Sequence, residues 1–145
     1  MKTADASGRR RAREAALQML YQWEVGRVGA HEAIVTYWPI RDPDRTVSED
    51  LRDFANGLVR GTIARVEEID GLLASRARNW RLERMAVIDR LILRLGVCEL
   101  LTEPETPAKV VINEAIELAR KFTGEEAVGF VNGILDAVRK DMGRQ

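Results

Sequence analysis

The chain has 145 residues, of which 46% are hydrophobic and 32% charged, and its 23 basic and 23 acidic side chains give a formal net charge of zero. This length suffices to bury a core without disulfides or metals, and the composition is typical of a folded globular protein. A net charge of zero excludes a uniformly basic coat for nucleic acid, although it permits a local basic patch. The single cysteine, Cys98, and the single histidine, His31, exclude an internal disulfide and a zinc cluster of cysteines and histidines.

The sequence also argues against membranes and catalysis. No apolar run approaches the ~18 residues that cross a bilayer, and no apolar segment follows the basic N-terminal residues as in a signal peptide. No glycine-rich phosphate-binding loop is present. We therefore predict a cytoplasmic protein that is not an enzyme, has no catalytic residues, and needs neither a cofactor nor a metal.

The first predicted helix runs from Arg9 to Val25, after Ser7 and Gly8 as possible caps. Residues 1–13 carry five basic side chains and one acidic side chain. Four arginines form what we call the basic tip: Arg9, Arg10, Arg11 and Arg13. Because Ala12 and Ala16 occupy the inward positions, we expect these arginines to point outward together. Guanidinium groups bind phosphates and stack on bases, so the tip predicts a partner; the alternative is a solvated tail that aids solubility.

Six further helical stretches are predicted along the chain. Helical spacing of apolar residues indicates them at 30–38, 48–77 with a break near 67–70, 82–101, 108–122 and 125–140. Pro39 and Pro43 predict a loop through Arg45, and Gly124 predicts a left-handed end to the fifth of these stretches. Cys98 lies on the apolar stripe of the central helix, which predicts a buried thiol. The fold expected from these patterns is all-α, a compact bundle of about seven helices, with a division into two subbundles possible around Arg78–Leu82.

Three stretches together resemble the family of the bacterial transcription antitermination factor NusB. The first is RRRAREAALQMLYQWE, residues 9–24. The second comprises Asn79-Trp80, Arg84, Asp89-Arg90, ILRL at 92–95 and Glu99-Leu100. The third is Pro107, Lys109-Val110 and INEAIELA at 112–119, closing with FVNGILD at 130–136. The resemblance extends along nearly the whole chain, residues 1–145, read as a single RNA-binding domain of two small helical subdomains.

The resemblance implies a protein that pairs with NusE, a small-subunit ribosomal protein. The pair would bind boxA-type RNA and load onto RNA polymerase complexes at ribosomal RNA operons, without catalysis. Tyr21 and Phe130 match family positions near the RNA and join the four arginines as expected RNA-binding residues. If each arginine neutralises one phosphate, binding to single-stranded RNA should have a log–log salt slope of about −3.

The expected NusE surface rests on fewer residues. The central helix carries Asp89, and the segment before it carries Arg76; we expect both in the protein interface, the alternative being intramolecular salt bridges. Ala127, Val128 and Gly129 depart from the family pattern, because many relatives have a hydroxyl and a Lys or His there. This departure predicts an altered RNA preference or affinity.

Two other functions remain open from the sequence. One is the NusB-like RNA-binding domain of a ribosomal RNA cytosine methyltransferase, which would need a further α/β domain. The other is a helical protein-interaction scaffold that does not bind RNA. The residues also leave open whether the free protein is a monomer or a homodimer.

Overall fold

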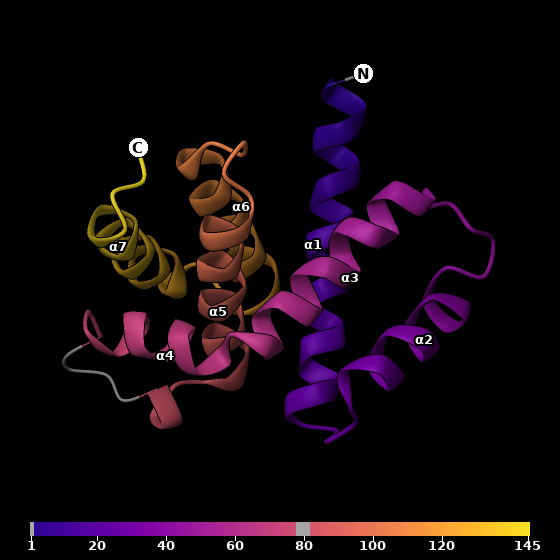
Figure 1. Cartoon of the computed structure of the whole chain (residues 1–145), viewed down its shortest axis with the longest axis horizontal. Helices are drawn as coiled ribbons and strands as arrows, with labels where there is room; N and C mark the ends of the chain where they lie inside the picture. Colours follow the sequence, from indigo (N-terminus) through magenta and orange to yellow (C-terminus); the bar gives the residue numbers. More distant parts are fainter. Residues whose placement is uncertain (1, 78–81) are drawn as a thin grey trace. The chain divides into compact units, whose positions relative to one another are not determined.

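Seven α-helices and one 3-10 turn make up the part of the chain that the structure describes, residues 2–77 and 82–145 of a computed structural model (Figure 1). The helices are α1 (Lys2–Glu24), α2 (Ala30–Arg41), α3 (Glu49–Ala64), α4 (Val66–Ala74), α5 (Val87–Thr102), α6 (Ala108–Phe122) and α7 (Glu126–Asp141), with the 3-10 turn η1 at Leu82–Arg84. No strand occurs among these residues, and the all-α prediction is confirmed. The predictions that involve Arg78, Asn79 and Trp80 lie outside the described residues.

The chain divides into two compact units, Met1–Ile63 and Ala64–Gln145. The expectation of two helical subdomains is therefore confirmed, but the boundary that we placed near Arg78–Leu82 is wrong. α4 packs against α5 and α7, so it belongs with the later helices. The apolar stripe continues from α3 into α4, which is why the sequence pattern alone conceals this boundary.

The first unit, α1 to α3, buries one face of each helix. Trp38 of α2 is buried, and its indole Nε1 donates a hydrogen bond to Asn56 Oδ1 of α3 at 3.0 Å. The guanidinium of Arg52 lies over the same indole, with Cζ 4.8 Å from the ring centre. The side chains that fill this core include Ala12, Ala16, Leu17, Leu20, Ile34, Ala55, Leu58 and Val59.

The second unit is built around α5, which packs against α4, α6 and α7 (Figure 1). Every residue from Arg90 to Leu100 is buried, which confirms the prediction of a central helix covered on several sides. Cys98 is among them and has no exposed surface, as predicted.

One glycine of α5 sets its distance from α7. A Cβ atom added at Gly96 would lie 2.9 Å and 3.2 Å from the two terminal carbons of Leu135, which is itself fully buried. Carbon atoms make favourable contact at about 3.5–4.0 Å. The missing methyl group at position 96 is therefore what lets Leu135 pack against the α5 backbone.

The first two helices differ from the prediction in their ends. α1 begins at Lys2, so Gly8 lies inside the helix rather than at its cap. A Cβ atom there would lie 2.5 Å from Leu51 Cδ1, and the glycine therefore permits a close approach to α3. α2 runs through Pro39 to Arg41, where we predicted a loop. Pro39 cannot donate to the Val35 carbonyl, but both residues are exposed, so water can satisfy that oxygen.

Later helix ends also differ. The break predicted near residues 67–70 occurs at Arg65, because Glu67 and Glu68 form the first turn of α4, where carboxylates complement the helix dipole. The helix predicted from Leu82 begins at Val87, since η1 comes first, with the Arg90 guanidinium donating to the Leu82 carbonyl at 2.9 Å.

The remaining helices follow the prediction closely. α6 matches its predicted range, and α7 is displaced by one residue. Gly124 has a φ of +146°, which favours glycine but is more extended than the left-handed helical conformation that we predicted.

Candidate nucleic-acid interface

The four arginines of the basic tip do not point outward together. Arg10 and Arg11 are exposed and Arg9 is half-buried, whereas Arg13 is only 4% exposed. Positions 9 and 13 are one helical turn apart and share a side of α1, while position 10 is displaced from that side by about 80° and position 11 by about 180°. The prediction of a fully outward-facing set is therefore wrong for Arg13.

Phe54 of α3 contacts both Arg9 and Arg13. The Arg9 Cζ atom is 4.3 Å from the centre of the Phe54 ring, and the Arg13 Cζ atom is 5.4 Å from it. A cation over an aromatic face is attracted by the ring quadrupole. Phe54 is thus a functional candidate that we did not identify from sequence, because nothing in the local pattern connects position 54 with positions 9 and 13.

Arg11 is attached to the loop after α2 through Asp42. The Arg11 guanidinium donates to Thr46 Oγ1 at 2.8 Å and lies 3.5 Å from Asp42 Oδ1. Asp42 also accepts from the Thr46 hydroxyl at 2.6 Å, from the Thr46 and Val47 amides at 2.9 Å each, and from Arg52 at 2.8 Å. An aspartate that accepts hydrogen bonds from backbone amides a few residues later in the chain is typical of a turn. The Asp42-Pro43-Asp44 sequence could therefore have predicted this turn.

These hydrogen bonds change the titration of Asp42. The Thr46 hydroxyl, followed by the amides of Val47 and Thr46 and the Arg52 guanidinium, holds the pKa of the Asp42 carboxyl well below its ordinary value, against the opposing effect of burial. Asp42 therefore stays ionised near neutral pH and provides a fixed negative charge beneath Arg11.

The two expected aromatic contacts lie in different units. Tyr21 is 39% exposed and lies on α1, about two turns after Arg13 at the end of the basic tip. Phe130 is half-buried in the second turn of α7. In the stretch that departs from the family pattern, Ala127 is buried, Val128 is half-buried and Gly129 is exposed.

The two expected interface residues have different surroundings. Arg76 donates through Nε to Asp141 Oδ2 at 2.7 Å, a contact that lowers the pKa of the Asp141 carboxyl. This is the intramolecular salt bridge that we considered as the alternative. Asp89 lies in the first turn of α5, and its Oδ1 atom is buried without a hydrogen-bond partner among the described residues. A buried carboxylate oxygen normally has a hydrogen-bond partner.

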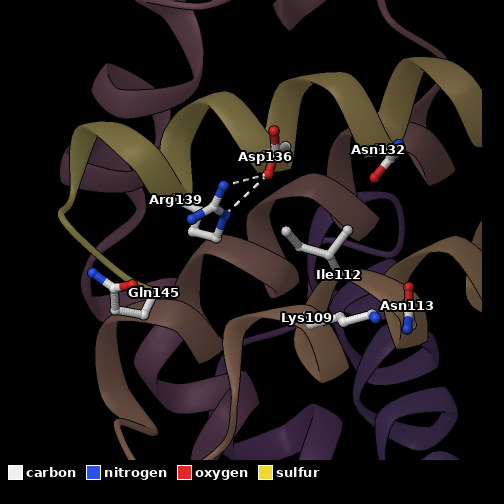
Figure 2. A pocket seen from close by; sticks show the side chains of 7 residues that line it. All are labelled: Lys109, Ile112, Asn113, Asn132, Asp136, Arg139 and Gln145. Atoms are coloured by element: carbon white, nitrogen blue, oxygen red, sulfur yellow. Dashed lines mark hydrogen bonds and ion pairs between the residues drawn. The ribbon is translucent and has the colours of Figure 1, made fainter.

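A cavity of about 340 Å³ lies between α6, α7 and the C-terminal residues (Figure 2). The amides of Asn113 and Asn132 line it, and both belong to the motifs INEAIELA and FVNGILD. The Arg139 guanidinium donates to Asp136 Oδ1 at 2.8 and 2.9 Å along its wall, as Figure 2 shows. The sequence interpretation used both motifs only for the resemblance and did not predict this cavity.

Neither a metal-binding cluster nor a membrane-spanning helix occurs among the described residues. No group of three or more His, Cys, Asp or Glu side chains is arranged to hold a metal ion there. No helix within residues 2–77 and 82–145 is long and apolar enough to span a membrane.

Comparison with known proteins gives a consistent result. The NusB family matches residues 10–140. The transcription antitermination protein NusB of Solibacter usitatus is 47% identical over 136 residues, which cover 94% of this chain and 91% of that protein. NusB from T. maritima has a similar structure, with a TM-score of 0.81 and 36% identity over 92% of this chain and 91% of that chain. A crystal structure of the antitermination factors NusB and NusE in complex with double-stranded RNA matches with a TM-score of 0.82 and 27% identity, over 93% of this chain and 98% of that chain.

Proposed function

This chain belongs to the NusB family, and on that premise we propose that it is a transcription antitermination factor that binds boxA-type RNA together with NusE. Its named relatives are transcription antitermination proteins, in agreement with the prediction that the chain is not an enzyme. The observation that carries the proposal is the basic tip, in which Arg10 and Arg11 are exposed in the first half of α1. We further propose that the complex acts in the cytoplasm, on RNA polymerase complexes at ribosomal RNA operons.

The proposed RNA contacts fall into two kinds. Arg10 and Arg11 neutralise phosphates, and Arg11 does so from a position fixed by Thr46 and Asp42. Tyr21 and Phe130 offer aromatic surfaces on which bases can stack. The acidic side chains outnumber the basic ones after residue 13, which disfavours RNA elsewhere on the protein.

We place NusE on the second unit. Asp89 is half-buried in the first turn of α5, and its carboxylate can accept a hydrogen bond from a donor of another protein. Arg76 would have to exchange its contact with Asp141 for one with NusE, so we expect a smaller contribution from it.

RNA binding is tested directly by fluorescence anisotropy. We would titrate the protein, with and without NusE, into labelled boxA-type RNA, a scrambled strand, and a double-stranded form of the same sequence. The double variant Arg10→Ala/Arg11→Ala should lose most of the affinity, while Arg41→Ala/Arg60→Ala, which removes two other exposed arginines, should bind like the wild type. Equal binding by both double variants would contradict the proposed role of the tip.

The competing functions give different results in this experiment. A helical scaffold would capture protein partners without binding any of the three RNAs. A domain related to a ribosomal RNA methyltransferase would bind structured RNA without preference for boxA-type sequence and without help from NusE. The sedimentation coefficient of the free protein, measured in parallel, would distinguish a monomer from a homodimer.

A further inference from the structure

The side chain of Arg9 packs on Phe54 and does not simply extend into solvent. Arg9 is half-buried, and its guanidinium carbon lies 4.3 Å from the centre of the Phe54 ring. The ring in turn comes from α3 and is half-buried, so it holds the guanidinium on a surface shared by two helices. The Cζ atom of Arg13, one turn further along α1, lies 5.4 Å from the same ring centre, and this side chain is buried.

A guanidinium held in this way presents a flat face as well as a charge. The group is planar and has two faces, and it is hydrated more weakly than an ammonium. When one face of a guanidinium lies on an aromatic ring, its opposite face can stack on a second flat group. In single-stranded RNA the flat groups are the bases, which stack on arginine as well as on aromatic side chains.

We propose that Arg9 is a base-stacking residue and that Phe54 is the positioning residue that orients it. The ligand is one unpaired base of a single-stranded RNA, placed in the order Phe54, Arg9, base. Arg9 would thus differ from Arg10 and Arg11, which act on phosphates. This inference rests on the proposed function, since it assigns a role within the same RNA site.

The charge-preserving substitution Arg9→Lys tests the proposal. Lysine keeps the positive charge but has no planar face. We expect affinity for single-stranded boxA-type RNA to fall about tenfold, with an unchanged salt slope, because the loss is one of stacking rather than of a phosphate contact. The matched control is Arg10→Lys, which should change the affinity less than about twofold.

Removing bases from the RNA identifies the partner of Arg9. An abasic nucleotide should be placed at each position in turn and the affinity measured for wild type and Arg9→Lys. At one position, the abasic strand should bind the wild type about tenfold more weakly than the intact strand does. Arg9→Lys should bind that abasic strand and the intact strand with equal affinity. A purely structural role of Arg9 would lower binding to every strand by the same factor.

Phe54 is tested by two substitutions with opposite expectations. Phe54→Tyr keeps an aromatic face beneath Arg9 and should bind RNA like the wild type. Phe54→Leu removes the aromatic face and should behave like Arg9→Lys: weaker binding of the intact strand, and no further loss when the same position is abasic. Circular dichroism verifies that the helices are retained.

The outcomes separate this inference from the proposed function. If the wild type binds RNA, and Arg9→Lys binds it with the same affinity and the same abasic profile, the stacking role is overturned and the proposed function stays intact. Absence of RNA binding by the wild type would overturn the proposed function, and this inference with it.

Discussion

Asp42 connects the stability of the first unit to the position of an RNA-binding side chain. Its carboxylate is almost completely buried and accepts hydrogen bonds from Thr46, Val47 and Arg52, and it lies next to Arg11. Because the pKa of Asp42 is lowered by folding, the folded protein binds fewer protons there than the unfolded chain. Its contribution to stability is therefore present above the ordinary carboxyl pKa and is lost as the pH falls below that value toward the folded pKa.

Substitution of Asp42 should reveal this dependence. We expect Asp42→Asn to lower the thermal midpoint clearly at pH 7, because Arg52 would remain buried without its counter-charge. The difference from wild type should shrink at pH 3, where the Asp42 carboxyl of the unfolded wild-type chain takes up a proton while that of the folded protein stays ionised. The exposed Asp44→Asn serves as the control and should melt close to the wild type at both pH values. A constant difference between pH 7 and pH 3 would contradict the assignment.

The burial of Arg13 changes the expected salt dependence of RNA binding. Since Arg13 is buried and Arg9 is assigned to base stacking, two arginines act on phosphates, and the log–log slope should be about −1.4 rather than the −3 that four exposed side chains predict. Arg10→Ala/Arg11→Ala should reduce the slope by about 1.4, since alanine preserves the helix. Affinity measured over a series of salt concentrations gives both numbers. A slope near −3 would show that Arg9 and Arg13 also neutralise phosphates when RNA binds.

Tyr21→Ala should affect RNA binding differently from the arginine changes. It removes a stacking surface without changing charge, so affinity should fall by about 1–3 kcal/mol while the slope stays nearly constant. The same salt series provides the measurement, with Tyr21→Phe as the control that keeps the aromatic face. A changed slope in Tyr21→Ala would indicate that the substitution disturbs the basic tip itself.

At the level of the helices, Trp38 is the main connection between α2 and α3. It combines a buried ring, the hydrogen bond to Asn56 and the contact with Arg52. Trp38→Ala should reduce the free energy of unfolding by about 3–5 kcal/mol. Val35→Ala, at an exposed position of the same helix, should cost less than about 0.5 kcal/mol. Urea denaturation of the two variants measures the difference, and similar losses in both would mean that α2 is held in some other way.

Helix positions were predictable where a local signal marked the end. Pro107 and the Thr123-Gly124 pair frame α6, whose predicted range agrees with the structure. The start of α1 and the passage of α2 through Pro39 were not predictable, because they depend on contact with Leu51 and on the solvent around Val35. Arg13 illustrates the same limit within the site: its burial depends on Phe54, forty-one positions away in the sequence, which periodicity along α1 does not reveal.

For the whole molecule, the separation of charge is the property that the sequence shows most directly. The net charge is zero, yet five of the 23 basic side chains lie within the first 13 residues. Such an arrangement favours the approach of RNA to one end of α1, and this attraction depends on ionic strength.

The sequence motifs also sufficed to predict the family and the all-α fold. They did not locate the boundary after Ile63, because the helix-forming pattern runs across it.

A short basic tip on an otherwise acidic chain leads us to expect that NusE strengthens RNA binding. By linkage, RNA must then strengthen NusE binding by the same factor. Isothermal titration of each partner, in the presence and absence of the other, measures both factors. Asp89→Asn should weaken the binding of NusE and leave the RNA affinity of the free protein unchanged. Equal RNA affinity with and without NusE would refute the coupling.

The close contact of Gly96 with Leu135 makes these two positions dependent on each other in mutation. Gly96→Ala alone should act as a wedge between α5 and α7 and cost about 1–3 kcal/mol, since Leu135 is fully buried and has little room to move. Leu135→Val shortens the opposing side chain and should partly suppress that defect, so the double variant should be more stable than the sum of the single losses predicts. Gly96→Ala would therefore be a temperature-sensitive mutation, and Leu135→Val its suppressor. A strain carrying Gly96→Ala should lose the protein's activity as the temperature rises. Adding Leu135→Val should restore that activity without changing the proposed RNA or NusE contacts.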